Sequence, residues 1–128
     1  MPPDERILEL TRLWWVRAVE DLDVARISRR FPFAACFHCQ QAVEKAIKAL
    51  LVYHQRDFGK THDIAELLTL LQSTANPHPT TEGLERLTRF AVETRYPPGT
   101  ATPEEAEEAI GKTEAFLVWA HQALPTEV

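Results

Sequence analysis

Apolar residues recur with a helical period through the middle of the chain, between residues 35 and 53. Drawn on a helix, they cover more than half of the circumference: Cys39, Ala42, Val43, Ala46, Ile47, Ala49, Leu50 and Tyr53. The remaining positions form a narrow polar strip, with His38 on its flank: Gln41, Glu44, Lys45 and Lys48. A surface helix has a single apolar face, so this pattern predicts a central helix with neighbours on several sides. Charged groups beside a core must be paired, solvated or used in function.

The helix before it carries two apolar stripes. It is expected to run from the N-cap Asp4 to about residue 30, and the central helix from Pro32 to about residue 54. The main stripe of the first helix comprises Ile7, Leu10, Trp14, Ala18, Leu22 and Ala25. A second stripe lies on nearly the opposite side and comprises Leu13, Val16, Val24 and Ile27. We expect the second stripe either to meet another copy of the chain or to lie under the fifth helix or a loop.

Three further helical patterns follow the central helix. A short third helix is expected to start at Ile64, with Asp63 as its cap. The fourth should end before the prolines of residues 96–100, and its inward positions are Leu84, Leu87, Ala91 and Val92. The fifth should begin at Thr102, Pro103 and Glu105 and reach Leu124, after which the tail is expected to fray. With no strand pattern of useful length, we predict an all-α, antiparallel up-and-down bundle of about five helices in one domain, residues 1–128.

Composition narrows the functional classes. The formal net charge of the 128 residues is −5, so nucleic acid would have to bind at a local basic patch rather than through the charge of the whole molecule. The sequence contains no apolar run long enough to span a membrane and no apolar signal core at its start. We therefore expect a cytoplasmic protein without a membrane partner.

Two cysteines form a C-x-x-C pattern, Cys36 and Cys39, with His38 between them. Both fall in the apolar arc of the central helix, and no second Cys/His pair is spaced to complete the four ligands that zinc needs. We interpret them as two small buried thiols and predict neither a metal nor a cofactor, since the sequence also lacks a Gly-rich phosphate loop, H-E-x-x-H and G-x-S-x-G.

The candidate chemistry gathers around His62. Arg56, Lys60 and His62 share one expected loop, and folding could bring Arg95 close to them. Arginines would hold a phosphate as bidentate donors while the histidine carries a proton, which is the equipment for metal-free RNA cleavage. In the alternative interpretation, His62 only begins the third helix, and Arg56 and Lys60 are solvated.

The polar strip has two interpretations as well. Glu44 and Lys48 are one turn apart in the order that favours a helical ion pair. Such a pair on the surface would contribute little to stability. The functional interpretation is that Gln41, Glu44 and Lys48 line a ligand-binding groove. Arg95 is structural if a carboxylate such as Glu44 pairs with it, and functional if it holds a phosphate.

Several of these residues, in this order and spacing, resemble the HEPN family of small prokaryotic helical proteins. The resemblance rests on the stretch QQAVEKAIKALL, on the His62-Asp63-Ile64 step, on Arg95-Tyr96-Pro97, and on an aromatic and acidic first helix. It implies an all-α bundle that dimerises and binds nucleotide or RNA. It also implies a nucleotidyltransferase-like partner in a toxin–antitoxin pair.

The resemblance also implies that active members of that family are metal-independent endoribonucleases. Their catalytic motif is an arginine followed by four to six residues and a histidine. Arg95 has no histidine at that distance downstream, whereas Arg56 and His62 fit the spacing but lie before the third helix. Binding with cleavage, which would use His62 with Arg56 or Arg95, and binding without cleavage are therefore both expected outcomes. A non-enzymatic oligomerisation or assembly module is the alternative function.

Overall fold

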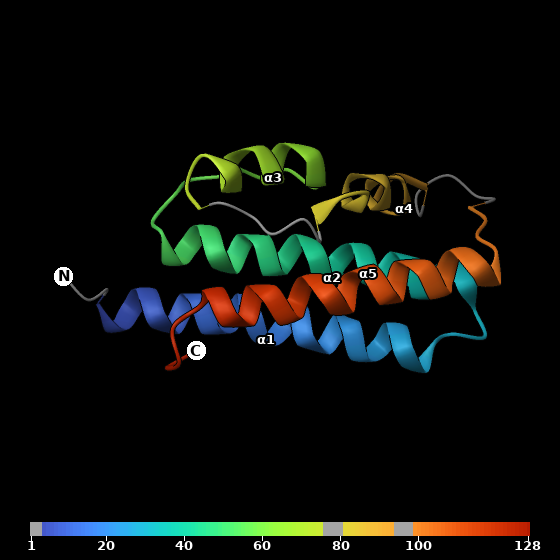
Figure 1. Cartoon of the computed structure of the whole chain (residues 1–128), viewed down its shortest axis with the longest axis horizontal. Helices are drawn as coiled ribbons and strands as arrows, with labels where there is room; N and C mark the ends of the chain where they lie inside the picture. The colour runs from blue at the N-terminus through green and yellow to red at the C-terminus, as the bar shows by residue number, and fades with distance from the viewer. Residues whose placement is uncertain (1–3, 76–80, 94–98) are drawn as a thin grey trace.

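The helical architecture follows the predicted order. A computed structural model describes residues 4–75, 81–93 and 99–128 of the chain. Within these residues the α-helices are α1 (Glu5–Ile27), α2 (Pro32–Tyr53), α3 (Ile64–Gln72), α4 (Thr88–Glu93) and α5 (Pro103–Ala123), and a 3₁₀ helix, η2 (Leu84–Leu87), leads into α4. The described part of the chain contains no strand, so the prediction of an all-α bundle of five helices is confirmed (Figure 1).

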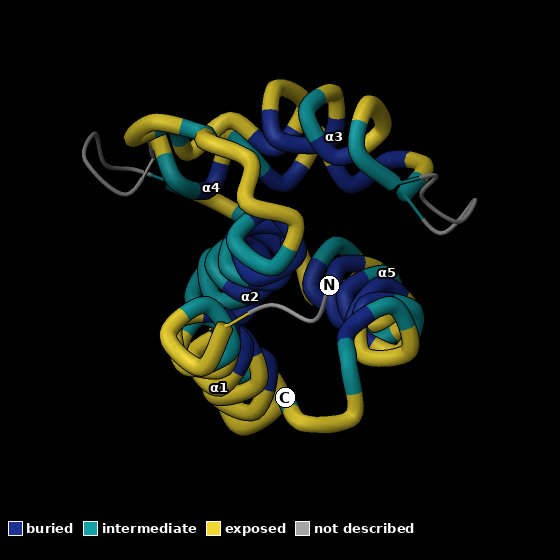
Figure 2. The backbone as a smooth tube through the Cα atoms, turned by 90° about the vertical axis from the view of Figure 1, so that its left-hand side faces the viewer, coloured by how far each residue is buried: buried dark blue, intermediate teal, exposed yellow. Residues whose placement is uncertain are grey.

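The three long helices pack side by side, and the short ones lie across one side of α2 (Figures 1 and 2). Helix α1 runs antiparallel to α2, as a short connection requires. Helix α5 runs in the same direction as α2, because the segment containing α3, η2 and α4 returns the chain to the end where α2 began. The chain therefore makes one long crossover, which places α3 and α4 on one side of α2.

Helix α2 is the central element. It contacts α1, α3, η2, α4 and α5. The residues of α2 that are buried among them include Ala35, Ala42, Ala46, Ala49, Val43, Ile47, Leu50 and both cysteines. Small side chains such as Ala35, Ala42 and Ala46 are fully buried on this helix. They let the neighbouring backbones approach closely, while Ile47 and Leu50 fill the remaining volume. The predicted central helix is confirmed.

Most helix starts follow their capping residues. The carboxylate of Asp4 accepts from Ile7 N at 2.9 Å, and that of Asp63 accepts from Ala65 N at 2.9 Å. Thr102 and Glu105 form a full capping box, each side chain accepting the backbone N–H of the other residue at 3.0 Å. These bonds satisfy N–H groups that have no partner inside the helix, so the starts of α1, α3 and α5 were predictable from local sequence.

Four details differ from the predictions. Helix α1 ends at Ile27 instead of at about residue 30, and Leu10 is exposed although it belongs to the main stripe. In α4, Val92 is 56% exposed and does not face inward, because the segment starts as a 3₁₀ helix whose period turns later residues to another side. The tail does not fray: Leu124 is buried, and Arg12 Nη2 donates to the carbonyl of Glu127 at 2.7 Å.

No described segment of the chain covers the second stripe of α1. Leu13, Val16, Val24 and Ile27 are all exposed, Ile27 at 81%, and the outer side of α1 is exposed along its length in Figure 2. The expectation that the fifth helix or a loop covers this stripe is therefore wrong. That a second copy of the chain covers it stays a prediction.

Candidate functional site

The polar strip of α2 is buried at two of its four positions and half-buried at the other two. Glu44 and Lys48 are both buried, and Glu44 Oε2 accepts from Lys48 Nζ at 3.0 Å. The predicted ion pair therefore exists, but it lies inside the protein, where an unpaired charge would be costly. The functional interpretation placed Gln41, Glu44 and Lys48 along a ligand-binding groove. It is wrong for Glu44 and Lys48, because both are buried and Lys48 lies against Trp14 of α1 and Phe58 of the loop before α3.

Lys48 is enclosed by two aromatic rings. Its Nζ lies 5.4 Å from the ring centroid of Trp14 on α1 and 5.4 Å from that of Phe58 in the loop before α3. The two rings meet edge to face with centroids 6.1 Å apart. Both rings attract the ammonium through their negative faces. The ammonium group of Lys48 therefore interacts with Glu44, Trp14 and Phe58 and is not placed to contact a ligand.

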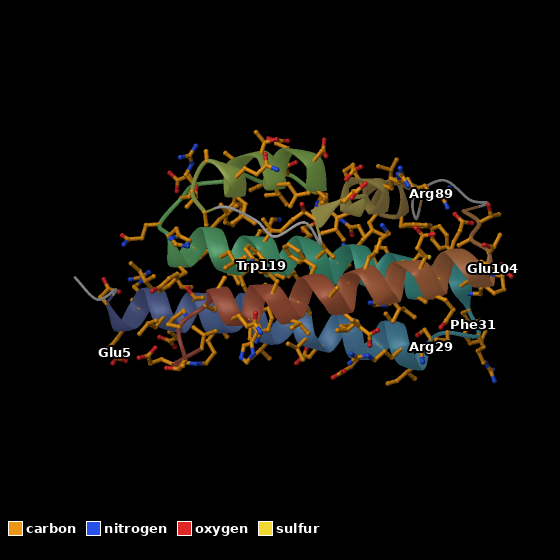
Figure 3. All side chains as sticks on the ribbon, in the orientation of Figure 1. Glu5, Arg29, Phe31, Arg89, Glu104 and Trp119 are labelled. Carbon is orange, nitrogen blue, oxygen red and sulfur yellow. The ribbon has the colours of Figure 1, made fainter. Side chains whose placement is uncertain are left out.

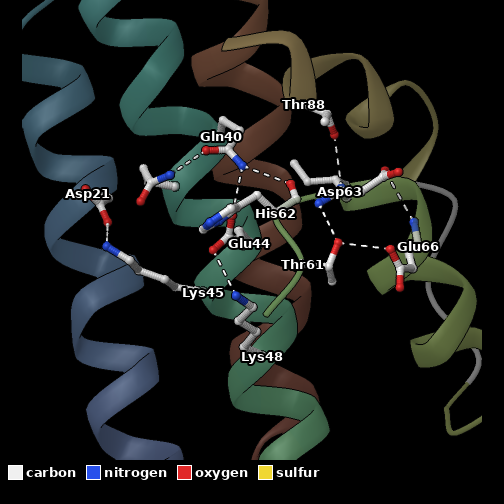
Figure 4. Close-up of polar contacts among 12 residues, drawn as sticks. Asp21, Gln40, Glu44, Lys45, Lys48, Thr61, His62, Asp63, Glu66 and Thr88 are labelled. Atoms are coloured by element: carbon white, nitrogen blue, oxygen red, sulfur yellow. Dashed lines mark hydrogen bonds and ion pairs between the residues drawn. The ribbon is translucent and has the colours of Figure 1, made fainter. Parts of the chain in front are cut away.

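The Glu44 carboxylate links α2 to the loop before α3. Its Oε1 accepts from Gln40 Nε2 at 3.0 Å and lies 3.0 Å from His62 Nδ1 (Figure 4). Because an ionised carboxylate only accepts hydrogen bonds, His62 Nδ1 carries the hydrogen in this contact. Three side chains from two segments therefore satisfy one buried charge: Gln40, Lys48 and His62.

The ring of His62 is anchored to Glu44 through Nδ1, while most of its side chain is exposed to solvent. Its side chain is 60% exposed, whereas that of Glu44 is 4% exposed. Gln40 Nε2 also donates to the His62 carbonyl at 3.3 Å. Helix α3, which follows, is connected to α4 because Ile64 N donates to Thr88 Oγ1 at 3.0 Å. With Nδ1 engaged by Glu44, Nε2 is the ring nitrogen left to face a ligand. An oriented, exposed imidazole can accept or donate a proton near neutral pH.

The other predicted site residues are less closely connected. Gln41 is half-buried, and its Nε2 donates to Gln40 Oε1 at 2.6 Å, so it joins the network through Gln40. Arg56 and Lys60 are exposed on the loop, and neither side chain forms a hydrogen bond or an ion pair with the described residues. Arg56 instead borders a shallow cavity beside Ile7 and Phe58. Arg95 lies outside the described residues.

A second polar cluster, which the sequence did not predict, joins α1 to α2. Asp21 is buried on α1, and its carboxylate lies 2.9 Å from His38 Nδ1 and 2.6 Å from Lys45 Nζ. His38 and Lys45 are two helical turns apart and so share one side of α2. That spacing, together with an acidic residue among the core positions of α1, was the available signal. Gln40 was missed as well, and nothing distinguished its amide from that of Gln41.

The two cysteines are inert thiols in this environment. Burial raises the pKa of Cys36 to about 11 and that of Cys39 to about 12. The interpretation of both as buried thiols is confirmed. Among the described residues, no three His, Cys, Asp or Glu side chains gather where they could hold a metal ion. None of the described helices combines the length and the apolar character that crossing a bilayer requires.

Comparison with known proteins agrees with this architecture. The HEPN domain profile matches residues 11–123. The crystal structure of an archaeal HEPN homologue superposes with a TM-score of 0.72 at 27% sequence identity, and the match covers 88% of this chain and 96% of that one. No curated protein sequence matches the chain.

Proposed function

The chain belongs to the HEPN domain family, and we propose that it binds RNA or nucleotide at the exposed imidazole of His62. The observation that carries the proposal is the contact of 3.0 Å between His62 Nδ1 and Glu44 Oε1. A buried carboxylate that orients an exposed histidine is a costly arrangement for a purely structural residue, because the same loop could be anchored by apolar packing.

The residues assigned to this proposed site divide into two roles. Arg56 and Lys60 are exposed cations on the same loop and are suited to hold phosphate oxygens, and Arg95 is the third cation of this proposal. Glu44 and Gln40 are positioning residues that hold the ring and the backbone of His62. Lys48 and Gln41 support them through their bonds to Glu44 and Gln40. Local cations of this kind let a chain with a net charge of −5 bind a polyanion.

Cleavage of RNA would use the free Nε2 of His62. The ribose 2′-hydroxyl attacks the neighbouring phosphorus, and the bond from phosphorus to the 5′ oxygen breaks. A general base on the protein removes the proton of the 2′-hydroxyl, and a proton is delivered to the leaving 5′ oxygen. The products are a 2′,3′-cyclic phosphate and a 5′-hydroxyl. His62 is the proposed proton carrier. The cations stabilise the negative charge on the oxygens of the five-coordinate phosphorus.

The experiment is incubation of the purified protein with single-stranded RNA in EDTA, beside His62→Ala, Arg56→Ala and Arg95→Ala. His54→Ala is the matched control, since His54 is exposed at the other end of the same loop. Cleavage that falls by about 10²-fold or more in His62→Ala, and not in His54→Ala, supports the enzyme. Binding without cleavage, weakened by the same substitutions, supports a binder. The absence of both activities from the native protein would contradict the proposal.

A second candidate function is a non-enzymatic assembly module. The observation that favours it is the uncovered apolar stripe of α1: Leu13, Val16, Val24 and Ile27. The stripe would meet a second copy of the chain, and a nucleotidyltransferase-like protein is the proposed heterologous partner in a toxin–antitoxin-like pair. Co-expression with the product of a neighbouring nucleotidyltransferase reading frame, followed by co-purification, tests that pairing. Failure of the two proteins to co-purify argues against it.

A further inference from the structure

A cavity of about 480 Å³ lies between the η2–α4 segment and α5, apart from the residues that hold His62. We call it the α4–α5 cavity. Its floor is apolar and consists of Leu87, Phe90 and Ala109, all of which are buried. Its rim is charged, with Arg86, Arg89 and Lys112 as cations and Glu105 and Glu108 as carboxylates. Cavities of this size with an apolar floor and a few convergent polar groups are typical of small-molecule sites.

One arginine of the rim is fixed in place by its neighbours. Arg89 Nη2 donates to Glu105 Oε2 at 2.5 Å, and its guanidinium lies 4.4 Å from the centroid of the Phe90 ring. Glu105 is itself committed, because its other oxygen accepts the backbone N–H of Thr102. That backbone bond is the main reason why the pKa of Glu105 is lowered, and Arg89 lowers it further. Figure 3 shows Arg89 on α4 beside the start of α5, which Glu104 marks.

The second cation, Lys112, is positioned by a hydrogen bond to a backbone carbonyl. Lys112 Nζ donates to the carbonyl of Glu82 at 3.2 Å and lies only 3.9 Å from Glu108 Oε1. Gly83 makes room for it: a Cβ at this position would come within 2.8 Å of Lys112 Nζ, and Gly83 has a φ of +84°. The turn before η2 thus leaves room for the ammonium group, and Lys112, with one hydrogen bond to Glu82, lines the cavity.

The third cation has no partner within the described part of the chain. The side chain of Arg86 is exposed on the rim, and it forms no hydrogen bond or ion pair with any described residue. Three cations face two carboxylates, and one of those carboxylates is already engaged twice. The rim therefore has a surplus of positive charge and unused N–H donors, in a protein whose net charge is −5.

We propose that the α4–α5 cavity binds a small phosphomonoester, with Arg86 and Lys112 donating to its phosphate and the apolar floor receiving its organic part. A guanidinium fork and an ammonium group match the geometry and the charge of phosphate oxygens. The carboxylates limit the rim to one such group, because a second would meet Glu105 and Glu108. This site is independent of His62 and of the proposed RNA chemistry.

The test is calorimetric titration of the full chain with AMP, inorganic phosphate, adenosine and a short single-stranded RNA. We expect AMP to bind, inorganic phosphate to displace it, and adenosine to bind at least tenfold more weakly. Arg86→Ala should weaken AMP binding about tenfold, which is the loss expected for a charge-assisted hydrogen bond. Arg86→Glu should abolish it. Arg17→Ala is the matched control, an exposed arginine on α1 away from the cavity.

Every other outcome overturns the proposal. Equal binding of AMP and adenosine would show that the cavity does not recognise phosphate. RNA binding that depends on Arg86, without AMP binding, would make the rim a polyanion surface. AMP binding that is lost in His62→Ala and kept in Arg86→Glu would place the nucleotide at His62 and leave the proposed function intact. Because Arg86 is exposed and unpaired, its substitution should not unfold the protein, which far-ultraviolet circular dichroism checks.

Discussion

Glu44 and His62 are 18 positions apart in the chain, and their side chains meet at 3.0 Å between Oε1 and Nδ1. Glu44 is buried and His62 is exposed, so the contact links a buried charge to a side chain on the protein surface. The ion pair of Glu44 with Lys48 on the other carboxylate oxygen makes this possible, because the carboxylate is compensated even when His62 is neutral.

Removing one member of the buried pair should be strongly destabilising. Glu44→Ala leaves Lys48 buried and unpaired, and we expect the free energy of unfolding to fall by about 3–5 kcal/mol. The double variant Glu44→Leu with Lys48→Met should recover much of that loss, since it removes both charges. Urea denaturation measures these values. Glu107→Ala, which breaks the exposed pair with Arg29, is the control and should cost less than about 1 kcal/mol.

Substitution of two glycines should have opposite effects. Gly83→Ala forces a side chain into a φ of +84° and against Lys112, so we expect a loss of about 1 kcal/mol or more. Gly111 lies within α5, where an added Cβ would meet no heavy atom within 4 Å apart from its chain neighbours and the backbone of its own helix, and Gly111→Ala should stabilise the protein by about 0.5–1 kcal/mol. Thermal denaturation followed by circular dichroism distinguishes them. Equal melting temperatures would show that the turn before η2 adapts without strain.

The buried cysteines should make the protein less stable at high pH. The pKa of Cys36 rises to about 11 and that of Cys39 to about 12 on folding, from an ordinary value of 9.0. A raised pKa means that the folded state holds these protons more tightly. The stabilisation is complete below about pH 9 and is lost as the pH rises toward 11–12.

Urea denaturation from about pH 8 to about pH 10.5 measures that dependence. The free energy of unfolding should fall as the pH rises, and Cys36→Ala with Cys39→Ala should fall less steeply than the native chain. Thiol-reactive reagents should label the native protein slowly and the urea-unfolded protein rapidly. Rapid labelling of the folded chain would contradict the burial of both side chains.

The exposed stripe of α1 should form a homodimer contact. Leu13→Glu with Ile27→Glu introduces charge where a second copy would pack, so light scattering after size-exclusion chromatography should change from dimer to monomer. Val118→Glu is the control, because Val118 is also exposed but belongs to α5. A native chain that is monomeric at high concentration would remove the basis for this prediction.

Part of the candidate site was predictable from sequence, and part was not. The ion pair of Glu44 with Lys48 follows from their spacing on one helix. The burial of the pair was not predicted, because it depends on Trp14 and Phe58, which come from two other segments. The cluster of Asp21 with His38 and Lys45 and the α4–α5 cavity were also missed, since each exists only where separate helices pack together.

The sequence by itself determined the helices, their caps and the central position of α2, because periodicity and capping are local properties that a few neighbouring residues specify. Only the tertiary structure decided the parallel course of α2 and α5, the enclosure of Lys48 and the exposure of the outer stripe of α1. Those features depend on which surfaces meet after the chain crosses over α2. Whether a charge is buried or solvated is settled by such distant neighbours, so the same Glu44 could be taken for a surface residue in sequence and is a buried one in the fold.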